Sequence, residues 1–194
     1  MDFQVQIPSF NSIRTKSVYP KATNILNKFK KAQVRDSKRG LAKAKLKDTS
    51  TLNRSVRGIV KKFAFRGSGG RFTGGTTMPS LDFKYLMYGE FHDKGVKGSK
   101  SSQNAPTSPY KYRGGGKTIK QQPIRQWLQR KGLPTSLTYI ISKRIYERGL
   151  KTTNWWSTPF RKNYSKYMHQ YHKAIADDIA TNVGNQLIKQ LKTK

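Results

Sequence analysis

The sequence contains no cysteine, few acidic residues and no long apolar run. Without cysteine, the chain can form neither a disulfide nor a thiolate metal site. No stretch approaches the ~18 consecutive apolar residues of a membrane-spanning helix, so we expect no membrane partner. Residues 1–10 also lack the apolar core of a signal peptide. The composition therefore predicts a soluble protein that needs neither an oxidising compartment nor a bilayer.

The shortage of acidic residues leaves a large excess of positive charge. The 194 residues include 40 Lys and Arg against 9 Asp and Glu, which gives a net charge of +31. Charge of one sign at this density repels itself, so we expect a polyanion or an acidic protein as neighbour. Nucleic acid is the usual partner of such a chain, and a solvated basic tail is the alternative interpretation.

Catalytic and metal-binding groups are equally scarce. Glu90, His92 and Asp93 could form a general acid–base group, but a nuclease usually gathers several carboxylates around Mg²⁺. His169 and His172 stand three apart on an expected helix, and no third ligand follows at a recognisable spacing. We therefore expect no enzyme activity, no catalytic residue, no cofactor and no metal site.

The hydrophobic pattern predicts one domain with two extensions. Residues 1–21 are expected to be an extended arm, and residues 22–175 a single domain that includes a surface loop at 99–122. Residues 176–194 are expected to end a long C-terminal helix that begins near Arg161. The length of the loop suggests a functional contact.

Within the domain, we expect a basic amphipathic helix over 22–47, interrupted at Gly40, and a strand over 52–65. Residues 79–92 are ambiguous, because Leu81 and Phe83 alternate as in a strand whereas Pro79 suits the start of a helix.

A helical hairpin is predicted over residues 123–160. Pro123 suits a first helical position, and Gly132 can supply a left-handed C-cap. The expected buried residues are Ile124, Trp127 and Leu128 on the first helix and Leu137, Ile140, Ile141 and Ile145 on the second.

Basic and aromatic side chains alternate in several segments. Such mixtures suit stacking on single-stranded nucleic acid and also suit protein interfaces, and the sequence leaves both interpretations open. The candidate partner-binding residues are Tyr110, Tyr112, Arg113, Trp155, Trp156 and Phe160, together with Lys30, Lys31, Arg35, Lys38 and Arg39 of the basic helix.

Four motifs occur in an informative order over roughly residues 50–175. They are Met78-Pro79 with Asp93-Lys94-Gly95-Val96 and Gly98, then Ile124, Trp127 and Lys131-Gly132-Leu133, then Ile141, Ile145 and Gly149, and finally Pro159-Phe160. This order resembles the tailed-bacteriophage neck and tail-completion (head–tail joining) proteins.

The resemblance implies an α+β fold: a small antiparallel β-sheet with helices packed on it, a long C-terminal helix and an extended N-terminal arm. It also implies that residues 79–92 are largely helical or turn-like. Trp155, Trp156 and Phe160 would then fasten the hairpin to the C-terminal helix.

The resemblance further implies a non-enzymatic virion structural protein that forms a homo-oligomeric ring at the portal, neck and tail junction. Its partners would be acidic surfaces of the portal and of other neck or tail virion proteins, with genomic DNA in the channel as a further candidate. It would be located in the virion, and in the host cytoplasm during assembly. The alternative from composition is a sequence-independent basic nucleic-acid-binding protein.

Overall fold

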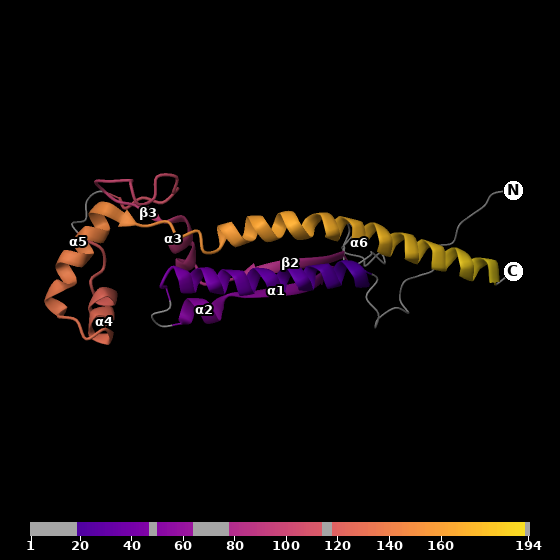
Figure 1. The fold of residues 1–194 in the computed structure, drawn as a ribbon, viewed down its shortest axis with the longest axis horizontal. Helices are drawn as coiled ribbons and strands as arrows, with labels where there is room; N and C mark the ends of the chain where they lie inside the picture. The colour runs from indigo at the N-terminus through magenta and orange to yellow at the C-terminus, as the bar shows by residue number, and fades with distance from the viewer. Residues whose placement is uncertain (1–18, 47–49, 64–77, 114–117, 193–194) are drawn as a thin grey trace, which may run out of the picture. The chain divides into compact units, whose positions relative to one another are not determined.

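The computed structural model describes residues 19–46, 50–63, 78–113 and 118–192 (Figure 1). The fold is α+β with two small antiparallel sheets, which confirms the predicted class and the long C-terminal helix. The helices are α1 (Pro20–Lys43), α2 (Thr51–Ser55), α3 (Tyr88–Lys94), α4 (Gln122–Arg130), α5 (Thr138–Arg148) and α6 (Ser157–Lys192). One sheet pairs β1 (Arg57–Phe63) with β2 (Met78–Lys84), and the other pairs β3 (Val96–Lys97) with β4 (Gly149–Leu150).

The chain divides into two compact units. The first comprises Met1–Arg35, Arg57–Phe83 and Arg161–Lys194, and the second comprises Asp36–Val56 and Lys84–Phe160. The single domain predicted over 22–175 therefore contains parts of both units. The predicted arm over 1–21 lies mostly outside the described residues, and α1 begins at Pro20.

In the first unit, α1 and α6 run side by side (Figure 1). Leu26 and Phe29 on α1 are buried, as their helical spacing predicts. The ring of Phe29 stacks on Tyr167 of α6 with centroids 5.7 Å apart, and it meets Phe83 of β2 edge-on at 5.5 Å. The core of this unit thus joins α1, β2 and α6.

Asp178 of α6 caps the N-terminus of α1. Its two carboxylate oxygens accept hydrogen bonds from the backbone N–H groups of Lys21 (3.2 Å) and Ala22 (2.9 Å). Pro20 occupies the first helical position, and Tyr19 before it has no side-chain oxygen suited to this role. A carboxylate from a distant helix therefore replaces the usual local cap.

Residues 50–92 differ from the sequence prediction in two places. The strand predicted over 52–65 begins only at Arg57, because Thr51–Ser55 form helix α2 and the Ser55 hydroxyl bonds to the Leu52 carbonyl. Residues 64 and 65 lie outside the described part of the chain. Residues 78–84 are strand β2, so the helix or turn implied by the resemblance is wrong there and right only for Tyr88–Lys94.

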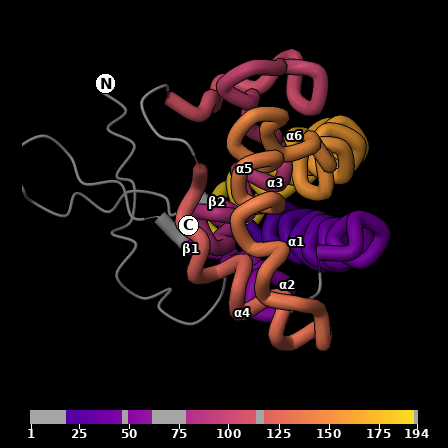
Figure 2. Tube along the Cα trace, turned by 90° about the vertical axis from the view of Figure 1, so that its left-hand side faces the viewer, coloured from indigo at the N-terminus to yellow at the C-terminus, as the bar shows by residue number. Residues whose placement is uncertain are grey.

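The α4–α5 hairpin belongs to the second unit, and its two helices are neighbours in both Figures 1 and 2. Ile124 and Leu128 are buried as predicted, whereas Trp127 is half-buried. Gly132 adopts a left-handed conformation (φ 67°) just after α4, which confirms the predicted C-cap.

The predicted buried face of α5 is wrong at Leu137 and Ile140, which are exposed. Thr138, Ser142 and Tyr146 point inward instead. Each of the three hydroxyls donates to a backbone carbonyl, at 2.6, 2.9 and 2.8 Å respectively. Burial of these polar groups is tolerated because their hydrogen bonds are made.

Gly40 does not interrupt α1, which continues to Lys43. A Cβ atom at this position would lie 2.7 Å from the carbonyl oxygen of Trp155. The glycine is therefore required by the close approach of another segment rather than by a helix break.

Candidate functional site

Asp93, at the end of α3, organises the second unit. Its side chain is 2% exposed. One carboxylate oxygen accepts the backbone N–H groups of Trp156 (2.7 Å) and Ser157 (3.1 Å), and the other accepts the Ser157 hydroxyl. Trp156 immediately precedes α6 and Ser157 begins it, and a negative charge at this end also interacts favourably with the helix dipole. Asp93 is thus a helix cap whose oxygens are occupied, in place of the general acid–base role considered above.

Three glycines around Asp93 allow two backbone segments to meet. Gly95 and Gly149 have positive φ angles of 73° and 83°. A Cβ on Gly98 would clash with the carbonyl of Glu147, and one on Gly149 would clash with the carbonyl of Val96. In the register Val96↔Leu150 and Lys97↔Gly149, β3 and β4 can pair only because glycine occupies these positions.

Trp155 is a core residue of this unit, with 1% of its surface exposed. Its indole N–H donates to the Gly89 carbonyl at 3.0 Å, and its ring meets Tyr85 edge-on at 5.4 Å. Trp156 contacts Tyr85 at 5.0 Å and stacks on Phe160 at 6.0 Å. Trp155 therefore packs against α3 and Tyr85, and its burial leaves it unavailable to a partner. Trp156 and Phe160 are half-buried.

Tyr110 lies in a small polar and aromatic cluster beside α3. Its ring packs edge-on against Phe91 at 4.8 Å, and the Lys94 ammonium lies 5.8 Å from its centroid. Lys94 also pairs with Glu90 at 2.7 Å. The hydrogen bond to Glu90 raises the pKa of Tyr110, and hydrogen bonds from Lys94 and Tyr110 lower the pKa of Glu90.

Tyr112 and Arg113 belong to the predicted surface loop, and hydrogen bonds to Lys97 and Tyr146 hold their backbone in place. The Tyr112 backbone N–H donates to Lys97 at 3.0 Å, and its ring lies 5.8 Å from Tyr146 of α5. Burial raises the pKa of Tyr112. The Arg113 carbonyl accepts the Tyr146 hydroxyl, while the Arg113 side chain is exposed. Two of the three loop candidates are therefore partly enclosed by the fold.

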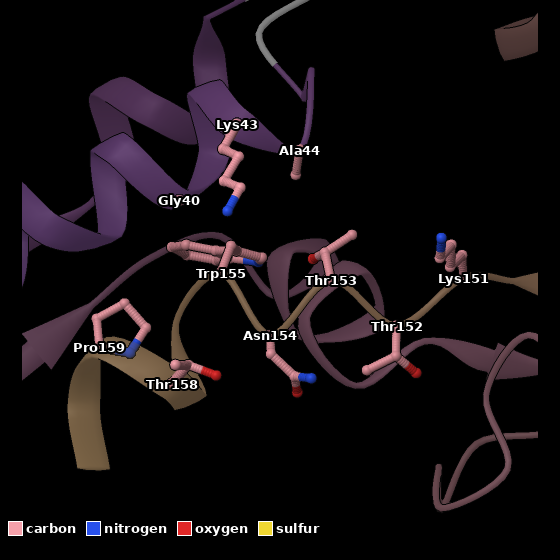
Figure 3. Close-up of a pocket in the computed structure, with 10 residues that line it drawn as sticks. All are labelled: Gly40, Lys43, Ala44, Lys151, Thr152, Thr153, Asn154, Trp155, Thr158 and Pro159. Carbon is pink, nitrogen blue, oxygen red and sulfur yellow. The ribbon is translucent and has the colours of Figure 1, made fainter. Parts of the chain in front are cut away.

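A cavity of about 500 Å³ opens between the end of α1 and the segment from Lys151 to Pro159 (Figure 3). Lys43 extends from α1 toward this segment, and Lys151 lies at the other end of the lining. Thr152, Thr153 and Asn154 line the space between them, where the Thr152 and Thr153 hydroxyls donate to the carbonyls of Lys94 and His92, and the lining contains no acidic side chain. Such a lining favours an anion over a cation. The sequence analysis missed it because Lys43 and Lys151 are far apart along the chain.

The basic candidates of α1 do not form a uniform face. Lys31 and Arg35 are exposed in the first unit, whereas Lys30 is half-buried with its stem against Gly58. In the second unit, Lys38 is half-buried, and the exposed Arg39 lies 3.9 Å from Asp36.

The described residues contain no group of three or more His, Cys, Asp or Glu side chains arranged to hold a metal ion. Burial lowers the pKa of His92, and both His169 and His172 are exposed. Across the same part of the chain, none of the helices combines the length and apolarity needed to cross a bilayer.

Comparison with known proteins gives no relative: no protein family, no curated protein and no solved structure matches this chain.

Proposed function

We propose that this chain is a non-enzymatic structural subunit of a tailed-bacteriophage virion, assembling as a ring at the portal, neck and tail junction. The observation that carries the proposal is the meeting of motif segments in the second unit. Asp93 of the first motif region binds the backbone of Trp156 and Ser157, next to the last motif. Strands β3 and β4 bring Val96 beside Leu150, and α4 packs on α5.

This convergence gives the resemblance a physical basis. Residues that look like separate short motifs along the sequence are the caps, glycine contacts and strand pairs of one small fold. Because these residues contact one another in the fold, we take their joint occurrence in this order as more informative than any one motif. The convergence of these motifs supports a shared scaffold rather than a shared reaction, because the central carboxylate, that of Asp93, accepts hydrogen bonds from backbone N–H groups.

Positive charge defines the partners that the proposal requires. The cavity lined by Lys43 and Lys151 and the exposed Lys31 and Arg35 suit acidic surfaces on the portal and on other neck or tail proteins. Genomic DNA in the channel is a further candidate, at about one charge per 1.7 Å of duplex. A subunit through which DNA passes must not hold it tightly, so acidic proteins are the preferred partners. The subunit would assemble in the host cytoplasm and remain in the virion.

Mass spectrometry of purified particles from the virus that carries this sequence tests the proposal. We expect the chain to be present at several copies per particle and to stay with tails or necks when capsids are disrupted. Absence from purified mature particles would refute it. The lysate is the control: if the chain is abundant there while the particles lack it, the absence does not reflect low expression.

A sequence-independent nucleic-acid-binding protein is the second candidate. Lys28, Lys31 and Arg35 recur at three- and four-residue spacing and are all exposed on α1. The test is the salt dependence of DNA affinity of the purified chain, measured by fluorescence anisotropy. If α1 binds phosphates, changing all three residues to Gln should reduce the slope of log affinity against log salt by about 3. Changing Lys143 and Arg144 of α5 to Gln should leave it nearly unchanged.

A further inference from the structure

The C-terminal part of α6 has an exposed apolar face. Farther toward its N-terminus, Ala174 and Asp178 point inward and are buried in the first unit. Ile179, Val183, Leu187 and Leu191 follow at every fourth position. At about 100° per residue, this row turns away from Asp178 around the helix, and Leu187 lies about 180° from it. The exposed fractions along this row are 45% for Ile179, 51% for Val183, 56% for Leu187 and 75% for Leu191. Ile188 is also exposed beside it. We call this surface the α6 apolar face.

The α6 apolar face is also free of charge over most of its length. Residues 179–188 contain no Lys, Arg, Asp or Glu, although about one residue in five of the whole chain is Lys or Arg. Copies of a chain with a net charge of +31 repel one another over most of their surfaces. An uncharged apolar strip is where two such copies can approach without bringing like charges together.

Gly184 lies in the middle of this face and has no contact that explains it. A Cβ atom added there would meet nothing within 4 Å. Glycine disfavours a helix relative to alanine, and no positive φ or close backbone contact requires it here. With Ala180 one turn earlier, it leaves a shallow place between Val183 and Leu187 where a second helix can approach closely.

The charges at the two ends of the face have opposite signs. Asp177, a partly exposed residue that lies 3.9 Å from Lys21 of α1, precedes it, and Lys189 and Lys192 follow Ile188. Two such helices in antiparallel orientation place the acidic end of one beside the basic end of the other, and they also oppose the helix dipoles favourably. In parallel orientation, aspartate would face aspartate and lysine would face lysine.

We propose that two copies of this chain pair through the α6 apolar face, with the two α6 helices antiparallel and closest near Gly184. The proposal deepens the function given above and rests on its premise that copies of the chain assemble, although the surface itself is argued from exposure and charge. Such a contact is two-fold symmetric and joins copies in pairs, so the ring proposed above closes through a different, head-to-tail contact, and the α6 pair belongs to the free chain before assembly. A contact of this length lies near the lower limit of about 1,000 Å² for specific interfaces, so we expect a micromolar dimer.

Sedimentation velocity of the full chain over a range of concentrations tests the pairing. The wild type should show a monomer–dimer equilibrium. Val183→Ala combined with Leu187→Ala should weaken dimerisation by at least about tenfold, because hot-spot side chains are removed from both copies. Both changes are compatible with a helix, since alanine has the highest helix propensity. The matched control is Leu133→Ala with Ile140→Ala, which removes exposed aliphatic groups from the second unit.

The control should dimerise like the wild type. The proposal is overturned if the wild type stays monomeric throughout, or if the control loses as much affinity as the α6 variant. Equal helix content by circular dichroism in all variants separates a lost contact from a lost fold.

Single cysteines test the orientation, because the chain has none of its own. In an antiparallel pair closest at Gly184, residue 180 of one copy lies beside residue 188 of the other. A mixture of A180C and I188C should therefore form a mixed disulfide dimer. Each variant alone should cross-link poorly, because like positions are separated by about 12 Å along the axis, beyond the ~7 Å reach of a disulfide. Preferential cross-linking of each variant with itself would overturn the antiparallel pair.

These results are independent of those for the virion. A chain that dimerises through α6 but is absent from particles supports the pairing and refutes the proposed function. A chain that is present in particles, stays monomeric and forms no A180C–I188C disulfide supports the proposed function and refutes the pairing. If the α6 variant keeps the wild-type association state but no longer enters particles, a different virion protein covers the face and the pairing is overturned.

Discussion

Replacing Asp93 by alanine should destabilise the protein more than any other single acidic-to-alanine change in the second unit. The carboxylate accepts two backbone N–H groups and one hydroxyl, and it is buried. In Asp93→Ala, the N–H groups of Trp156 and Ser157 lose their acceptor, whereas the half-exposed Ser157 hydroxyl can turn to water. With about 1.5 kcal/mol for each hydrogen bond to a charged group, the expected loss of unfolding free energy is about 3 kcal/mol.

Asp93→Asn separates the hydrogen bonds from the charge. One amide oxygen can still accept both backbone N–H groups, so the main loss is the interaction of the negative charge with the α6 N-terminus. That interaction is worth about 1 kcal/mol, so the asparagine variant should lie between the wild type and the alanine variant. Urea denaturation followed by tryptophan fluorescence is a suitable assay, because Trp155 and Trp156 lie directly beside the altered group.

Asp82→Ala is the matched control. Asp82 pairs with Lys61 at 2.6 Å, but both side chains are substantially exposed, so its removal should cost less than about 1 kcal/mol. The reasoning is refuted if Asp93→Ala falls within error of Asp82→Ala, or if the asparagine and alanine variants are equally unstable. A divalent-dependent nuclease activity that Asp93→Ala abolished at unchanged stability would refute it as well.

Three further predictions use the same urea assay. Asp178→Ala should cost about 2 kcal/mol, because α1 loses the carboxylate that caps it, and a cost below 0.5 kcal/mol would contradict that role. Trp155→Phe should cost about 2–3 kcal/mol, because the Gly89 carbonyl loses its buried donor and space is left behind; an unchanged midpoint would show that the indole N–H is dispensable. Burial lowers the pKa of His92, so the unfolded chain takes up a proton near pH 6.5 before the folded chain does. Stability should thus be full well above about pH 6.5 and fall as the pH drops below it, and His92→Gln should reduce that fall; identical pH profiles would contradict it.

Sequence patterns predict burial and helix ends correctly where these depend on residues close together in the sequence. Ile124 and Leu128 are buried because they share one side of α4, and Gly132 ends that helix in the left-handed conformation. The apolar periodicity of α5 predicts the wrong buried face, because hydrophobicity alone does not decide which side chains are buried there. Thr138 and Ser142 bond to carbonyls three residues earlier, so they can be buried at little cost while Ile140 is exposed.

The candidate site depends on contacts that no local pattern contains. Asp93 and the N–H group of Trp156 are 63 residues apart, and Gly40 is a glycine because Trp155 passes beside it. The sequence marked both Asp93 and Trp155 as notable, but for chemistry and for partner binding rather than for the cap and the core. The glycines carry a usable signal: Gly95, Gly98 and Gly149 belong to the motifs and lie where two backbones meet.

The α6 apolar face, unlike the candidate site, is visible as a local pattern in the sequence. Ile175, Ile179, Val183 and Leu187 recur at every fourth position of the sequence, but such periodicity does not tell whether the residues pack within the same chain or against another molecule. Ile179, Val183 and Leu187 are exposed because the buried side of α6 is formed by Ala174 and Asp178, which the pattern did not include.

Cryo-electron microscopy of purified particles, with this chain located in the density, tests the central proposal most directly. We predict a ring of copies at the junction between portal and tail, with the basic cavity of Lys43 and Lys151 facing acidic residues of a neighbouring protein. Particles whose neck and tail densities are fully accounted for by other proteins, or density for this chain only on packaged genome inside the capsid, would contradict it.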